Sequence, residues 1–138
     1  MTSTVVYEGG LRTTARHLRS GSAFETDAPV DNKGKGERFS PSDLVATALA
    51  SCMLTIMGMR ATEMDVDLKG VEVEVEKLMK TDPRRISGIN LTFHFPDSLS
   101  LNDRQQTILQ KAAESCPVIY SIHPDIAVNT NFNWKIPA

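Results

Sequence analysis

Residues 40–59 read SPSDLVATALASCMLTIMGM, and this stretch decides the fold. Ser40 is a favourable N-cap, Pro41 suits the first helical position, and Asp43 lies near the positive end of the helix dipole. The rest of the stretch is apolar on nearly every side, apart from a stripe of small polar residues. It predicts a long central helix that ends near Glu63 and is buried around its circumference, with help from a second subunit.

Short extended segments precede this helix. β-prone residues are separated by turn signals at Gly9-Gly10 and at Gly21, and together they predict a β-meander. The three expected strands cover residues 4–7, 12–18 and 23–26. A glycine-containing polar loop, residues 29–36, leads from the last strand to the helix.

The second half of the chain alternates between strands and helices. Residues 71–76 and 89–95 alternate apolar and polar side chains, which predicts a hairpin. A helix is expected over 100–114, a proline-started helical turn over 118–122 and a last strand over 126–134. The order βββ–α–ββ–α–β predicts an α+β fold with antiparallel sheets, formed by one domain over residues 1–138.

Composition limits the classes of function. The formal net charge is −2, so no basic field favours nucleic acid or an anionic membrane surface as a partner. No apolar run reaches the roughly 18–20 residues of a spanning helix, and the first residues lack the pattern of a secretory signal. We therefore expect a cytoplasmic protein. The three histidines are scattered, so no metal site and no bound cofactor are expected.

The chain has two cysteines, and each has a structural and a chemical interpretation. Cys52 lies mid-helix among apolar residues, where a free thiol is commonly an inert core residue and would need a nearby cation to ionise. Cys116 precedes Pro117 at a predicted helix start, where free N–H groups and the dipole should lower the pKa of the thiol. From the residues alone, Cys116 is the better-activated thiol.

Two segments around these cysteines resemble one known family. The segment GKGERFSPSDLVATALASCMLTI, residues 34–56, and the segment AAESCPVIYSIHPDIAV, residues 112–128, resemble the two signatures of the family of osmotically inducible protein C (OsmC) and organic hydroperoxide resistance (Ohr) proteins. The spacing of 64 residues between the cysteines and the order of elements fit as well. The resemblance covers nearly the whole chain and implies an OsmC-like fold that forms an intertwined homodimer.

The resemblance also implies a reaction. Cys52 would attack an organic hydroperoxide and become a sulfenic acid, and Cys116 would resolve it as a disulfide. An external dithiol, as on a lipoylated protein, would reduce that disulfide. The chain would thus be a cysteine-dependent peroxidase. The alternative is a stress-associated binding or redox-sensing protein of the same fold with little turnover.

In the family an arginine held by a carboxylate stabilises the first thiolate. Arg12 matches that arginine best, with Arg16 and Arg19 as rivals. The family glutamate after the helix-starting proline is Ser42 here, so Asp43 or Glu37 would have to replace it. Expected substrate-lining residues are Phe39, Met53, Met57 and Ile119.

Overall fold

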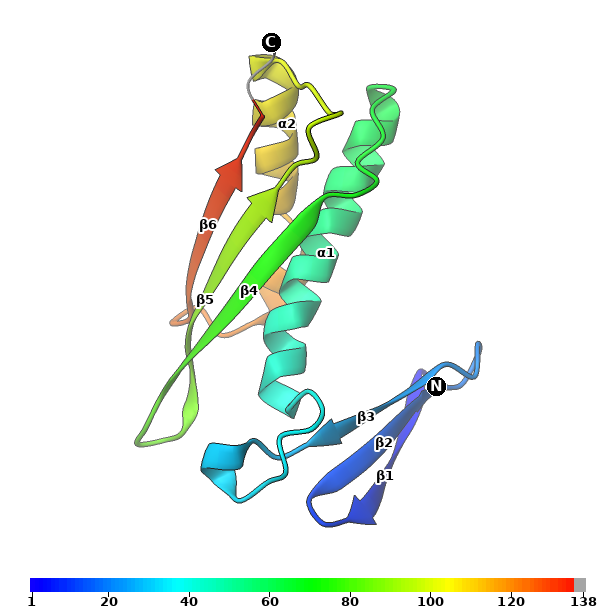
Figure 1. Ribbon diagram of the computed structural model, residues 1–138, viewed down its shortest axis with the longest axis vertical. Helices are drawn as coiled ribbons and strands as arrows, with labels where there is room; N and C mark the ends of the chain where they lie inside the picture. Colours follow the sequence, from blue (N-terminus) through cyan, green and yellow to red (C-terminus); the bar gives the residue numbers. More distant parts are fainter. Residues whose placement is uncertain (136–138) are drawn as a thin grey trace. The chain divides into compact units, whose positions relative to one another are not determined.

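The computed structural model describes residues 1–135, which form two compact units, Met1–Val45 and a second unit that begins at Ala46 (Figure 1). The strands are β1 (Ser3–Gly9), β2 (Arg12–His17), β3 (Ala23–Asp27), β4 (Glu72–Lys80), β5 (Arg85–His94) and β6 (Ala127–Asn133). The helices are a 3-10 turn η1 (Val30–Asn32), α1 (Pro41–Glu63), α2 (Asp103–Ala113) and α3 (Pro117–Ser121).

The first unit contains the expected meander. β1 pairs with β2 and β2 pairs with β3, both antiparallel, so the three predicted strands are confirmed. The register places Arg12 opposite Asp27 at the end of the β2–β3 ladder. These two residues are therefore neighbours because of the strand pairing and not because of a loop.

The loop after β3 folds back on the end of that strand. The Gly36 N–H donates to the Ala28 carbonyl at 3.1 Å, and the Gly34 N–H donates to the Pro29 carbonyl at 2.9 Å. A Cβ added to Gly34 would lie 1.7 Å from the Ala28 carbonyl oxygen, so this approach requires glycine. The closed loop brings Glu37 back to Asp27.

Helix α1 begins and ends where the sequence predicts. The Ser40 Oγ accepts from the Asp43 N–H at 3.1 Å, and the Asp43 carboxylate accepts from the Ser40 N–H at 2.9 Å. This reciprocal pair is a capping box, which satisfies two N–H groups that the helix leaves without partners. The helix extends to Glu63.

Within a single chain, α1 is fully buried on one face only, whereas the sequence predicted burial around its whole circumference. Its fully buried residues are Ala46, Leu49, Ala50, Met53, Met57 and Ala61, which form one face. The other faces are half-buried or exposed, as at Met59, because only one side of the helix packs against a sheet. The helix is also long and apolar enough to cross a membrane by length and composition, although core helices of soluble proteins meet the same criterion. This helix corrects the expectation that no apolar run reaches the length of a spanning helix.

The sheet of the second unit combines two kinds of pairing. β4 and β5 form the predicted antiparallel hairpin. β6 lies next to β5 but runs parallel to it, so the expectation of purely antiparallel sheets is wrong. The reason is the connection: α2 and α3 carry the chain back to the end at which β5 began, as a parallel pair requires.

One face of this sheet forms the core of the second unit. Ile89, Leu91 and Phe93 alternate along β5 and are almost completely buried, together with residues of α1 and α2. Phe93 stacks on Phe132 of β6 with ring centroids 4.5 Å apart. Both long helices therefore cover the same face of the sheet (Figure 1).

Candidate active site

The two thiols, 64 residues apart in the sequence, meet in the second unit. Cys52 is half-buried in α1, and Cys116 is fully buried at the N-cap of α3, directly before Pro117. Both are free thiols, and they lie close enough together for Cys52 to raise the pKa of Cys116. The pair can therefore become a disulfide if one sulfur is oxidised while the other remains a thiol.

The pKa of Cys116 is raised, so the expectation that it falls is wrong. Burial raises the pKa most, and the hydrogen bond with Cys52 and the charge of a Cys52 thiolate add to it. The helix start acts as expected, because the N–H groups of Ile119 and Val118 lower the pKa, but burial outweighs them. Cys116 is thus held as a protonated thiol beside Cys52.

In the first unit, Arg12 is held rigidly by Asp27. The Arg12 Nε lies 2.7 Å from Asp27 Oδ1, and the Arg12 Nη2 lies 2.8 Å from Oδ2, a bidentate pair. The Asp27 side chain is completely buried, and it also accepts from the Glu37 N–H at 3.2 Å. Hydrogen bonds from Arg12 hold the pKa of Asp27 below its ordinary value, against the opposite effect of burial, and raise the pKa of Arg12.

Sequence reasoning missed Asp27. It proposed Asp43 or Glu37 as the acid for Arg12; Glu37 lies 3.8 Å from the Arg12 Nη2, and the Asp43 carboxylate closes the capping box of α1. The signal for Asp27 was present in the meander. A hairpin closed at residues 17 and 22 places residue 12 opposite residue 27.

The other candidate arginines and the predicted lining residues have neighbours different from those of Arg12. Arg16 donates to the Gly21 carbonyl at 3.0 Å, and Arg19 is exposed. Met53 and Met57 are fully buried in the core of the second unit, and Ile119 packs against that core. Phe39 belongs to the first unit and is 54% exposed. Their role as substrate-lining residues stays a prediction.

Sequence and structure comparisons place these features in a family. The profile of the OsmC-like protein family matches residues 34–131, so the chain belongs to the OsmC-like family. A crystal structure from Psychrobacter arcticus, a candidate osmotic stress induced and detoxification response protein, is 50% identical and covers 96% of both chains with a TM-score of 0.92. A search of curated proteins finds no significant match.

More distant structures share the fold. An organic hydroperoxide resistance protein OsmC from Legionella pneumophila, also described as a predicted redox protein, is 20% identical over 96% of both chains, with a TM-score of 0.70. An organic hydroperoxide resistance protein from Elizabethkingia anophelis is 14% identical, covering 97% of this chain and 95% of its own, also with a TM-score of 0.70. At these identities the likeness extends to the fold.

Proposed function

We propose that this protein is a thiol-dependent peroxidase that reduces organic hydroperoxides to alcohols. The observation that carries the proposal is the neighbouring pair of free thiols, Cys52 and Cys116, in which Cys52 raises the pKa of Cys116. Membership of the OsmC-like family and the fold shared with organic hydroperoxide resistance proteins support a role in redox or hydroperoxide resistance.

The pair fits a two-step reduction. The Cys52 thiolate attacks the outer oxygen of ROOH, the O–O bond breaks, and with one proton the products are ROH and Cys52 sulfenic acid. The Cys116 sulfur then attacks the oxidised sulfur, an S–S bond forms and water leaves with the Cys116 proton. An external dithiol reduces the disulfide by thiol exchange and is itself oxidised.

Burial and the raised pKa of Cys116 support different roles for the two thiols. Cys116 is protonated and inaccessible, so it suits the resolving role, whereas the half-buried Cys52 is the thiol that a peroxide can reach. Cys52 is thus proposed as the attacking thiol, whereas the helix dipole alone suggested that Cys116 is the more reactive one.

We further propose that Arg12 supplies the positive charge for the Cys52 thiolate, as the family resemblance implies. Asp27 would then take the role of the family glutamate, because its carboxylate binds the Nε and Nη2 of the guanidinium. A homodimer is the proposed assembly, since α1 is apolar on faces that its own chain leaves exposed.

A lipoylated protein in the cytoplasm is the proposed source of the dithiol.

Steady-state kinetics test this function. Turnover of an alkyl hydroperoxide is compared with that of hydrogen peroxide, with a dihydrolipoyl system as reductant, for the parent protein and for Cys52→Ser. We expect turnover of the alkyl hydroperoxide by the parent and none by Cys52→Ser, because no second nucleophile replaces the thiolate. Negligible parent turnover would favour the alternative, a binding or redox-sensing protein, and equal rates for both proteins would contradict the role of Cys52.

A further inference from the structure

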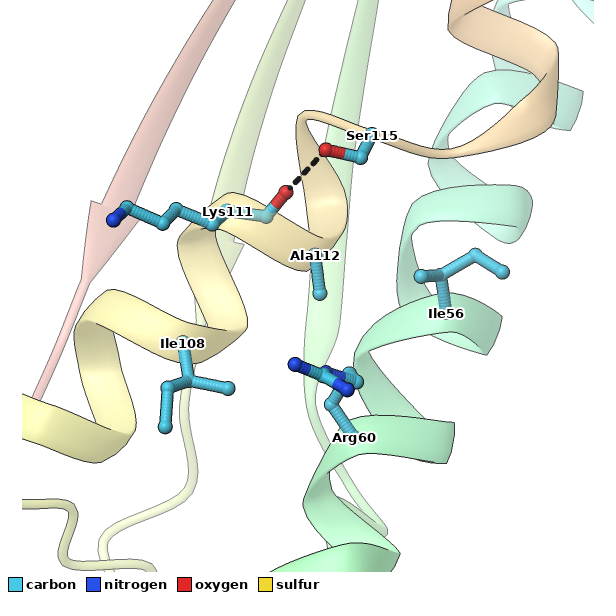
Figure 2. A pocket seen from close by; sticks show the side chains of 6 residues that line it. All are labelled: Ile56, Arg60, Ile108, Lys111, Ala112 and Ser115. Atoms are coloured by element: carbon cyan, nitrogen blue, oxygen red, sulfur yellow. Dashed lines mark hydrogen bonds between the residues drawn. The ribbon is translucent and has the colours of Figure 1, made fainter.

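The two neighbouring thiols offer a pair of sulfur ligands. Cys52 and Cys116 are both free, and Cys52 packs against the core cluster that contains Cys116. Their sequence neighbours also meet, because Ile56 lies one turn after Cys52 on α1. Ile56 lines one cavity together with Ser115, which directly precedes Cys116 (Figure 2). The pair can therefore close a ring around an atom that forms two bonds to sulfur.

The surroundings of the pair limit what such an atom can be. Within residues 1–135, no group of three or more His, Cys, Asp or Glu side chains could hold a metal ion. Zinc takes at least three protein ligands in structural and catalytic sites, so two sulfur atoms alone do not suit it. Copper(I) accepts two thiolates, but the complex keeps a negative charge, which the complete burial of Cys116 disfavours. The pair therefore favours a neutral, thiol-reactive group that needs only two sulfur ligands.

Trivalent arsenic in a monosubstituted arsenical meets these conditions. It carries one organic group, forms two further bonds to sulfur and stays neutral. A protonated thiol is a competent reactant, because its proton leaves with oxygen as water, so the raised pKa of Cys116 does not prevent the reaction. Cys52 is half-buried, so it can react first, and the organic group can remain at the surface while Cys116 closes the ring.

We propose that Cys52 and Cys116 together form a binding site for monosubstituted trivalent arsenicals. In the reaction of RAs=O with the two S–H groups, two As–S bonds replace the As=O bond, and both protons leave with the oxygen as water. Arsenic stays trivalent and neither sulfur is oxidised, so the step needs no oxidant or reductant. This inference goes beyond the proposed function, because binding does not require peroxidase turnover.

The test adds phenylarsine oxide to the reduced protein after the reductant has been removed. Intact mass spectrometry should show one phenylarsenic group per chain, with one water lost, and both thiols should stop reacting with a chromogenic disulfide. The adduct should survive an excess of a monothiol and be removed by a small dithiol, because only a dithiol can replace both As–S bonds at once.

Variants show whether both sulfur atoms bind the arsenic. Cys52→Ser and Cys116→Ser each leave a single As–S bond, so a monothiol should remove the probe from either variant. Their affinity should fall by at least about a hundredfold, the gain expected when a second bond forms within one molecule. Ser115→Ala, a change at the exposed neighbour of Cys116, is the matched control and should bind like the parent.

Three results would overturn the site: no adduct in the parent, an adduct that a monothiol removes from the parent, or a single-cysteine variant that binds as tightly as the parent. The first two use the parent alone, so they apply even if a variant does not fold. Hydroperoxide turnover is measured separately. A parent that holds the probe against a monothiol but reduces no hydroperoxide would keep this site and lose the peroxidase function.

Discussion

Removing Cys52 should make Cys116 ionise at a lower pH. Cys116 has a pKa raised above its ordinary value of 9.0, first by burial and then by the hydrogen bond and charge of Cys52. A thiol at the ordinary value is about one-tenth ionised at pH 8, so Cys116 should be ionised to a smaller extent than that. In Cys52→Ala only burial still raises the pKa, and the midpoint should move down toward 9.0.

The midpoint is measured by alkylation of the reduced protein across a pH series. Peptide mass spectrometry follows the Cys116 peptide, so the reaction of Cys52 does not interfere. The readout is the pH of half-maximal rate and not the rate itself, because burial slows access of the reagent to Cys116 at every pH. Ser51→Ala, a change at an exposed neighbour of Cys52, is the matched control and should leave the midpoint in place.

The reasoning would be refuted by a Cys116 midpoint below 9.0 in the parent protein, because the helix start would then outweigh burial. An unchanged midpoint in Cys52→Ala would also contradict it, since the two sulfur atoms would not interact.

Three further predictions follow from the same contacts. Phe93→Ala should lower the free energy of unfolding by about 3–5 kcal/mol in urea denaturation, because Phe93 is fully buried and stacked, whereas Tyr120→Ala at an exposed site should change it by less than about 0.5 kcal/mol. Because the pKa of Asp27 is lower in the folded protein, its carboxylate stabilises the fold at pH values above the unfolded pKa of about 3.8. This stabilisation is lost as the pH falls through the folded pKa. The acid unfolding of Asp27→Asn, followed by circular dichroism, should therefore depend less steeply on pH. Cys116→Ser should let Cys52 reach the sulfinic or sulfonic state under excess peroxide, and an intact mass without added oxygen would count against a resolving role.

Local patterns predicted much of the fold. The Ser40 cap and Pro41 fixed the start of α1, and period-two alternation located the β4–β5 hairpin. Alternation carries no information on strand direction, so β6 was placed correctly in the chain but in the wrong orientation. The apolar circumference of α1 indicated burial, but it could not distinguish a face packed within the chain from one that a second subunit would cover.

The sequence predicted only part of the candidate site. The thiol pair came from family resemblance, and the mid-helix position of Cys52 gave no physical reason to select it. The pKa of Cys116 was predicted in the wrong direction because a helix start is visible in the sequence, whereas complete burial is a property of the packed core. Asp27 could have been found by extending the hairpin register to Arg12.

Peptide mapping under non-reducing conditions, after one equivalent of an alkyl hydroperoxide, tests the central claim most directly. The account predicts a linked peptide containing Cys52 and Cys116 of the same chain, lighter by two hydrogen atoms than the reduced pair. An oxidised Cys52 beside a Cys116 that remains a free thiol would contradict it.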